Sequence, residues 1–248
     1  MVLTKKRNLI KALQRLPHGG PFGTDNLRAL GVSPALASHY AKSGWLERLG
    51  RGVFMFPGDT LQRESSVGFL ATRMAGLHVG GKTALAWRGV RHNLAVTERL
   101  SLWGEGPSKL PAWFVERFPA RYLARKLFNP KLPANLGLSP LLEFPDGPAV
   151  SEPERALLEM LSDVGVGQPV EEARRIMEGV RSVRPEVLAD LLRHCLRVKV
   201  IRLCVQWAEE LKLPWAGQAR GSARHTHDGS GSRWAMRLRD GTTLILKP

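Results

Sequence analysis

The sequence has few cysteines, few tyrosines and no long apolar run. Cys195 and Cys204 are its only cysteines, nine positions apart in a segment predicted to be helical. They cannot form a disulfide framework, and we expect them to be small core residues. No apolar stretch approaches the roughly 18–20 residues of a transmembrane helix, and no apolar segment follows the basic N-terminus as in a secretory signal. The sequence therefore predicts a cytosolic protein without disulfides or a membrane span.

Acidic residues are also scarce relative to basic ones. The 248 residues include 37 Lys or Arg and 22 Asp or Glu, a formal net charge of +15. Such an excess indicates a polyanionic partner, most often nucleic acid, although a basic protein with a merely solvated surface has the same composition. The length and the 43% hydrophobic content allow two domains or one large one.

Three short helices are predicted at the N-terminus. Apolar residues at helical spacing indicate the first, Lys5–Leu16. Thr24 is the expected N-cap of the second, Thr24–Leu30. Ser33 and Pro34 are typical of the start of the third, which extends to about Ser43 and ends at Gly44.

A predicted β-hairpin follows the third helix. The strand-like runs Trp45–Leu49 and Val53–Phe56 are joined by Gly50-Arg51-Gly52, and a glycine-containing link of this length indicates a tight turn. Three helices and a hairpin within this length predict a winged helix-turn-helix over residues 1–58. In such domains the last helix lies in the major groove of DNA.

The basic residues are concentrated in this segment. Nine Lys or Arg and two acidic residues precede residue 57, a local net charge of +7. Leu36, Ala37, Tyr40 and Ala41 of the third helix are predicted to face the core, whereas Arg51 lies at the hairpin tip, where its guanidinium could reach a phosphate or the minor groove. The predicted DNA-binding residues are Ser33, Ala35, Ser38, His39, Lys42, Arg48, Arg51, Lys5, Lys6 and Arg7. A protein-interaction domain with a basic face is the alternative.

Residues 59–248 are predicted to form a larger mixed α/β domain, so that the fold class is α+β. Helices are expected over 61–77, 83–90, 169–179, 185–194 and 196–211, and strands over 100–103, 113–118, 122–128 and 138–144. Ser151-Glu-Pro-Glu154 has the form of a capping box before another helix. Ala216–Ser232 is rich in Gly and Ser and is expected to be mobile, and Asp240-Gly241 predicts a closing hairpin.

Three motifs are similar to catalytic or metal sites, but each lacks a feature that such a site needs. Gly76–Thr83 fits the phosphate-loop pattern, but a helical segment precedes it where a buried strand is needed. Glu210-Leu-Lys212 is similar to the end of a nuclease motif, with Asp190 or Asp146 as possible metal partners, but it lies on a predicted helix. His225-Thr-His227-Asp228 has no second ligand cluster. We expect no enzyme, metal or cofactor; a DNA-processing, nuclease-like enzyme remains an alternative.

Several segments resemble AbiEi-family antitoxins, which are two-domain bacterial regulators of type IV toxin–antitoxin (abortive infection) systems. The similar segments are Gly44–Phe54, Gly80–Leu85 with Gly89-Val90, Ser151–Leu158, Arg202–Trp215 and the closing hairpin. Together they span nearly the whole chain.

The resemblance implies that the winged helix binds inverted repeats in the protein's own promoter and represses its operon. It also implies that the second domain carries the antitoxin activity against a nucleotidyltransferase-like toxin, with or without direct contact. Ser38, His39, Lys42, Arg48 and Arg51 are the positions that match the family's winged helix. The resemblance assigns no toxin-neutralising residues.

Overall fold

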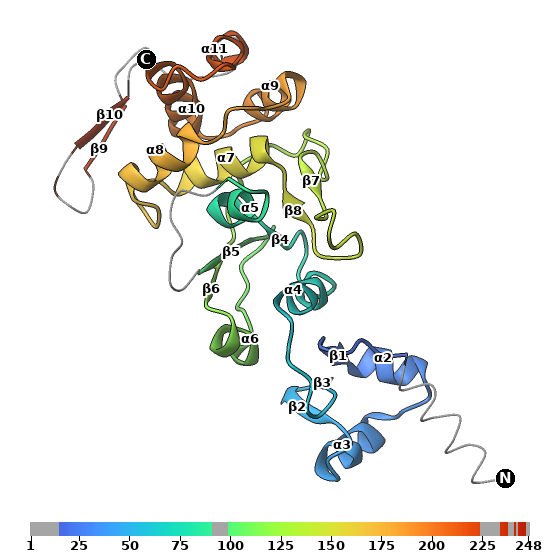
Figure 1. The fold of residues 1–248 in the computed structure, drawn as a ribbon. Coiled ribbons are helices and arrows are strands. Elements are labelled where there is room, and N and C mark those ends of the chain that lie inside the picture. The colour runs from blue at the N-terminus through green and yellow to red at the C-terminus, as the bar shows by residue number, and fades with distance from the viewer. Residues whose placement is uncertain (1–14, 91–98, 224–233, 238–240, 242, 247–248) are drawn as a thin grey trace. The chain divides into compact units, whose positions relative to one another are not determined.

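The chain folds into two compact units. The computed structural model describes residues 15–90, 99–223, 234–237, 241 and 243–246 (Figure 1). One unit comprises Met1–Ala75 and Ser108–Pro119, and the other comprises Gly76–Pro107 and Ala120–Pro248. Most of the predicted helix Lys5–Leu16 lies outside the described residues.

The first unit contains a winged helix-turn-helix. Its helices are α2 (Thr24–Ala29), α3 (Pro34–Lys42), α4 (Arg63–Ala71) and α6 (Ala112–Arg117). Its strands are β1 (Phe22–Gly23), β2 (Glu47–Gly50) and β3 (Val53–Met55), which form an antiparallel sheet in the order β1-β3-β2. The α2–α3 pair followed by the β2–β3 hairpin is the arrangement that the sequence predicts.

Local signals explain where α3 begins and ends. The Ser33 side chain accepts a hydrogen bond from the Leu36 N–H at 3.2 Å, and Pro34 occupies the first turn. Gly44 follows the helix with a φ of +78°, a conformation that favours glycine. At α2 the predicted cap was wrong. Gly23, not Thr24, is the N-cap, because Gly23 is still paired with Val53 in the sheet.

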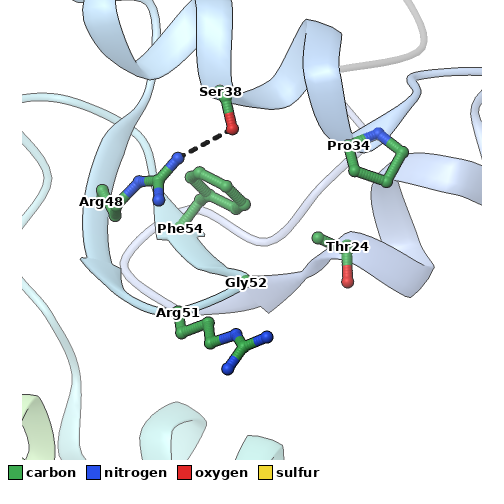
Figure 2. A pocket seen from close by; sticks show the side chains of 7 residues that line it. All are labelled: Thr24, Pro34, Ser38, Arg48, Arg51, Gly52 and Phe54. Carbon is green, nitrogen blue, oxygen red and sulfur yellow. Dashed lines mark hydrogen bonds between the residues drawn. The ribbon is translucent and has the colours of Figure 1, made fainter.

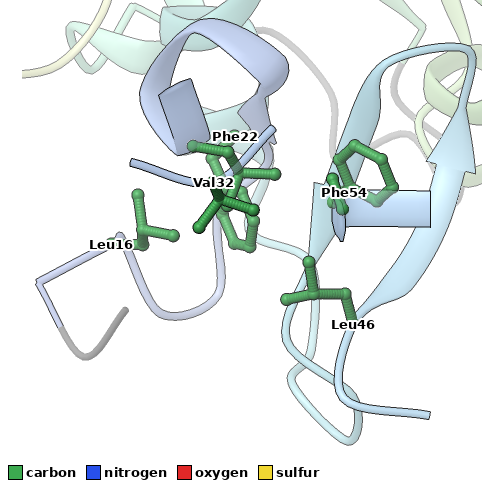
Figure 3. Close-up of a cluster of buried hydrophobic side chains, with 7 residues drawn as sticks. Leu16, Phe22, Val32, Leu46 and Phe54 are labelled. Atoms are coloured by element: carbon green, nitrogen blue, oxygen red, sulfur yellow. The ribbon is translucent and has the colours of Figure 1, made fainter. Parts of the chain in front are cut away.

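The core of this unit joins the helices to the hairpin (Figure 3). Phe22 and Phe54 are opposite each other in the β1–β3 pairing, and both are at most 2% exposed. Burial of each such side chain contributes about 1.5–3 kcal/mol. The buried cluster consists of Leu16, Phe22, Leu27, Val32, Ala37, Leu46 and Phe54.

The strand predicted over Trp113–Phe118 was wrong, because this segment forms helix α6. The aromatic residues suggested a strand. In a strand, however, successive side chains point to opposite faces, whereas the neighbouring Trp113 and Phe114 are both buried. The Trp113 ring packs edge-on against Phe69 of α4, with ring centroids 6.2 Å apart. Packing against α4 therefore favours the helical conformation of this segment over the strand that its aromatic residues suggest.

The second unit is built on a five-stranded mixed sheet in the order β6-β5-β4-β8-β7. The strands are β4 (His78–Val79), β5 (Leu100–Trp103), β6 (Ala120–Leu123), β7 (Leu138–Ser139) and β8 (Val150–Ser151). Pairing is parallel between β5 and β6 and between β4 and β8, and antiparallel elsewhere. The Arg88 guanidinium ties the β7–β8 edge together, since it donates to the carbonyls of Ser139, Val150 and Ser151.

Six helices and a β-hairpin are also described in this unit. They are α5 (Gly81–Trp87), α7 (Pro153–Asp163), α8 (Val170–Glu178), α9 (Pro185–Arg193), α10 (Val198–Glu210) and α11 (Ala216–Ala223), followed by the antiparallel hairpin β9 (Trp234–Arg237) and β10 (Thr243–Leu246). The predicted mobile segment thus begins with a helix. Ala219 and Ala223 of α11 are buried, and the indole N–H of Trp215 just before α11 donates to the Val180 carbonyl at 2.7 Å.

Candidate nucleic-acid interface

Helix α3 has one face in the core and one face in solvent. Ala37 is buried, and Leu36, Tyr40 and Ala41 pack against the core cluster. Ser33, Ala35, His39 and Lys42 are exposed, and Ser38 is half-buried. The predicted division between the two faces is therefore confirmed, and α3 presents short or hydrogen-bonding side chains to solvent.

The β2–β3 hairpin is fixed at both ends. Trp45 and Leu46 each donate a backbone hydrogen bond to the Tyr40 carbonyl, which holds the start of the hairpin to the end of α3. At the turn, Gly52 has a φ of +71°, and its carbonyl accepts a hydrogen bond from the Thr24 N–H at 3.1 Å. The turn that carries Arg51 is thereby attached to the first turn of α2.

Arg48 is held in place by two contacts. Its Nη2 atom donates to the Ser38 hydroxyl oxygen at 2.9 Å, and its guanidinium carbon lies 5.4 Å from the centroid of the Phe54 ring. Phe54 is opposite Arg48 in the β2–β3 pairing and is only 2% exposed, so its ring is a fixed support. At an exposed position such as that of Arg48, a cation–π contact contributes about 0.5–1 kcal/mol, so these contacts restrain the side chain.

A hollow of about 470 Å³ lies between α3 and the hairpin (Figure 2). Figure 2 shows Arg48 directed toward Ser38 beside the Phe54 ring, and Arg51 at the hairpin turn with its side chain directed away from both. The lining residues are Thr24, Pro34, Ser38, Arg48, Arg51, Gly52 and Phe54. Two of them are arginines and none is acidic, so the hollow suits an anion.

The structure brings together part of the predicted set. Ser38, Arg48 and Arg51 line the hollow, whereas Ala35, His39 and Lys42 lie elsewhere on α3. Lys5, Lys6 and Arg7 lie outside the described residues. Thr24 and Phe54 also line the hollow, although no sequence motif marks them as site residues; only the pairing of Phe54 with Arg48 across the hairpin could have indicated Phe54.

The segment Gly76–Thr83, which fits the phosphate-loop pattern, binds a carboxylate of the same chain. The Gly81 N–H donates to Glu159 Oε2 at 3.0 Å, and Glu159 is 1% exposed. His78, Ser151 and Arg155 contact the same carboxylate at 3.0, 2.8 and 3.1 Å. Ser151 therefore belongs to this buried cluster and to β8, and the capping box predicted for it was wrong: Glu152 is the N-cap of α7.

The acidic residues of the nuclease-like motif form ion pairs and hydrogen bonds at the surface. Glu210 of α10 pairs with Arg174 at 2.6 Å and accepts a hydrogen bond from Gln206. Asp190 pairs with Arg193 one turn along α9. Within the described ranges, no three His, Cys, Asp or Glu side chains lie close enough to hold a metal ion. The motif at residues 225–228 lies outside those ranges.

Two family models match consecutive parts of the chain. Residues 5–96 match the N-terminal domain of the transcriptional regulator and antitoxin AbiEi, and residues 97–244 match the transcriptional regulator, AbiEi antitoxin of type IV toxin–antitoxin systems. The chain belongs to the AbiEi family. The AbiEi models thus cover both the winged helix and the larger mixed domain, and the resemblance drawn from the sequence is confirmed.

The AbiEi chain is also similar in fold to a solved structure. The crystal structure of the RV2827C protein from Mycobacterium tuberculosis matches it with a TM-score of 0.61 at 15% identity, over 94% of this chain and 89% of that chain. At this identity the likeness concerns the fold. A search of curated proteins finds no match. None of the described helices is long and apolar enough to cross a membrane.

Proposed function

We propose that this AbiEi-family regulator binds double-stranded DNA in its own promoter through the winged helix and represses its operon. The observation that carries the proposal is the basic hollow between α3 and the hairpin, in which the exposed Arg48 side chain already contacts Ser38 and the Phe54 ring. The exposed face of α3 beside it would enter the major groove. The proposed DNA-binding set is Ser33, Ala35, Ser38, His39, Lys42, Arg48 and Arg51, joined by Lys5, Lys6 and Arg7 of the N-terminal segment.

The same proposal assigns the DNA-binding domain to residues 1–58 and the antitoxin activity to residues 59–248. The compact unit around the winged helix also contains α4 and α6. Trp113 of α6 packs against Phe69 of α4. The partner of the second domain would be a nucleotidyltransferase-like toxin from the same operon, and the promoter sites would be inverted repeats, since two copies of one reader match a two-fold symmetric site.

Titration of the full-length protein onto its upstream DNA at two salt concentrations tests the DNA-binding part. A winged helix that contacts about six to ten phosphates gives a log–log slope of affinity against salt of about −5 to −9. Unrelated duplex of the same length is the control. Flat salt dependence, or equal affinity for both duplexes, contradicts the proposal.

Co-expression with the neighbouring gene tests the antitoxin part. We expect the neighbouring gene to be toxic alone and tolerated with this protein. A promoter fusion measured in the same cells reports repression separately. If toxicity persists while the promoter is repressed, the antitoxin assignment fails and the DNA-binding assignment stands.

A further inference from the structure

The hollow beside α3 offers several hydrogen-bond donors. Because Arg48 already donates to the Ser38 oxygen, the Ser38 hydroxyl group has its own proton left to donate. The Arg48 guanidinium has five N–H groups, of which the bond to Ser38 uses one. Arg51 at the hairpin turn and Thr24 at the first turn of α2 also line the hollow, with their polar ends directed away from Arg48 and Ser38 (Figure 2), so Arg51 has to turn to reach the same anion.

The charge of the hollow selects among DNA groups. Of the described residues that line it, none carries a carboxylate. Two acidic residues are sequence neighbours of lining residues, and both face arginines: the Asp25 carboxylate lies 3.6 Å from Arg73 and the Glu47 carboxylate lies 3.4 Å from Arg117. In the major groove, guanine presents two uncharged acceptors to an arginine and the other bases present donors or methyl groups as well, whereas a backbone phosphate is anionic and presents acceptors alone. The donors of the hollow therefore match a phosphate better than a base.

We propose that the hollow is the site of one DNA backbone phosphate, held by Arg48 and Arg51 with the Ser38 hydroxyl as an additional donor. This inference rests on the proposed DNA binding and specifies its geometry. Ser38 is removed from the base-reading residues and becomes a phosphate contact. Base reading on α3 falls to Ala35, His39 and Lys42, which are exposed and outside the hollow.

Phe54 is a positioning residue in this arrangement. Its ring supports the Arg48 guanidinium from the core side at 5.4 Å, so the arginine loses little further side-chain freedom when the phosphate arrives. Phe54 also fills the core, so most replacements would impair folding as well as the support of Arg48. Phe54→Leu separates the two effects, because it keeps most of the buried volume and removes the aromatic face.

Neutralisation of single phosphates in the DNA tests the site. Uncharged methylphosphonate is placed at one position at a time in a duplex from the upstream region, and full-length wild type, Arg48→Gln, Ser38→Ala and Arg28→Gln are titrated onto each. At one position, methylphosphonate should weaken wild-type binding by about tenfold or more. The same substitution should have little further effect on Arg48→Gln and a reduced effect on Ser38→Ala. Arg28 is exposed on α2 outside the hollow, so Arg28→Gln should behave as wild type.

Two readouts decide between phosphate and base contact. Arg48→Gln should reduce the steepness of the log–log salt dependence by about one on any duplex, as expected for one lost phosphate contact. Ser38→Ala should weaken binding to the upstream duplex and to duplexes with single base-pair changes by the same factor. A changed base preference in Ser38→Ala, or full methylphosphonate sensitivity in Arg48→Gln, overturns the inference.

Inorganic phosphate separates failure of this inference from failure of the proposed function. Titration of phosphate into the isotopically labelled protein should shift the NMR signals of the Arg48 and Arg51 side chains and leave Arg28 unchanged. If these shifts occur but the upstream DNA is not preferred, the promoter assignment fails and the anion site stands. If the upstream DNA is preferred but the phosphate shifts are absent and the salt dependence of Arg48→Gln is unchanged, the anion site fails alone.

Discussion

The Gly81 N–H donates a hydrogen bond to the buried carboxylate of Glu159 at 3.0 Å, although the two residues are 78 positions apart. The Gly80-Gly81-Lys82-Thr83 turn matches a phosphate-binding pattern, but its backbone donor is directed at an anion from α7. A Cβ at Gly80 would lie 2.3 Å from the same carboxylate, so close packing requires the first glycine, and the φ of +56° at Gly81 favours the second. The motif is therefore part of the core of the second unit.

Replacement of this carboxylate should destabilise the protein. Glu159→Gln removes the charge that faces His78 and Arg155 in a site with almost no solvent, and we expect a loss of about 2–4 kcal/mol in the free energy of unfolding. Chemical denaturation measures it. Glu178→Gln, at an exposed position of α8, is the control and should be within about 0.5 kcal/mol of wild type. Equal stability of the two variants would refute the structural role of Glu159.

The same cluster should make the protein sensitive to acid. Burial alone would raise the pKa of Glu159, but the charge and hydrogen bond of His78, with Arg155 and Ser151, outweigh it and hold the pKa below its ordinary value of 4.5. A carboxyl group whose pKa is lowered on folding stabilises the protein above its unfolded pKa, and this stability is lost as the pH falls through the folded pKa. Unfolding measured between neutral pH and strong acid should show a shallower loss of stability in Glu159→Gln.

Lys199, a basic residue, should affect the stability of the protein in the alkaline range. Burial and the neighbouring Arg125 and Arg197 lower its pKa to about 8, against the opposing effect of Asp163. The folded protein disfavours the ammonium form, so the contribution of Lys199 to stability rises between pH 8 and the ordinary pKa of 10.5. The difference in unfolding free energy between wild type and Lys199→Met should increase over this interval. A constant difference would contradict the lowered pKa.

The two thiols should react slowly in the folded protein. Burial raises the pKa of Cys195 to about 11 and raises the pKa of the fully buried Cys204 as well. Thiolates are the reactive form, so alkylation by iodoacetamide near neutral pH should be slow until denaturant is added. Mass spectrometry of the alkylated protein gives both rates. Fast modification of Cys204 without denaturant would show that the surrounding helices open readily.

Arg51 and His39 should affect DNA binding in different ways. Arg51 lines the hollow, so Arg51→Gln should weaken binding to all duplexes by about tenfold. His39 is exposed on α3 outside the hollow, and His39→Ala should change the preference among base sequences. Competition assays with operator and single-mismatch duplexes separate the two effects. The same pattern of loss for both variants would argue against the division of roles.

The parts of the fold that local chemistry determines could be predicted from the sequence. Ser33 with Pro34 marks the start of α3, Gly44 marks its end, and Gly52 permits the hairpin turn. These signals act within a few residues, so no knowledge of the rest of the chain is needed.

The parts that depend on distant residues could not be predicted in this way. Trp113 belongs to a helix because it packs against Phe69, although its aromatic neighbours favour a strand. The cluster around Glu159 joins residues from β4, β8 and α7, and no local pattern indicates that pairing. In the hollow, the basic residues were predictable, but the bond from Arg48 to Ser38 depends on how the hairpin lies against α3.

The hydrogen bond from the Thr24 N–H to the Gly52 carbonyl has a kinetic consequence. A turn that is attached to α2 should need little ordering when it meets DNA, so we expect rearrangement of the hairpin to slow association little. The association rate constant is then governed by electrostatic steering, and it should fall as salt screens the charge of the hollow. The lifetime of the complex, in contrast, depends on the short-range contacts made after docking.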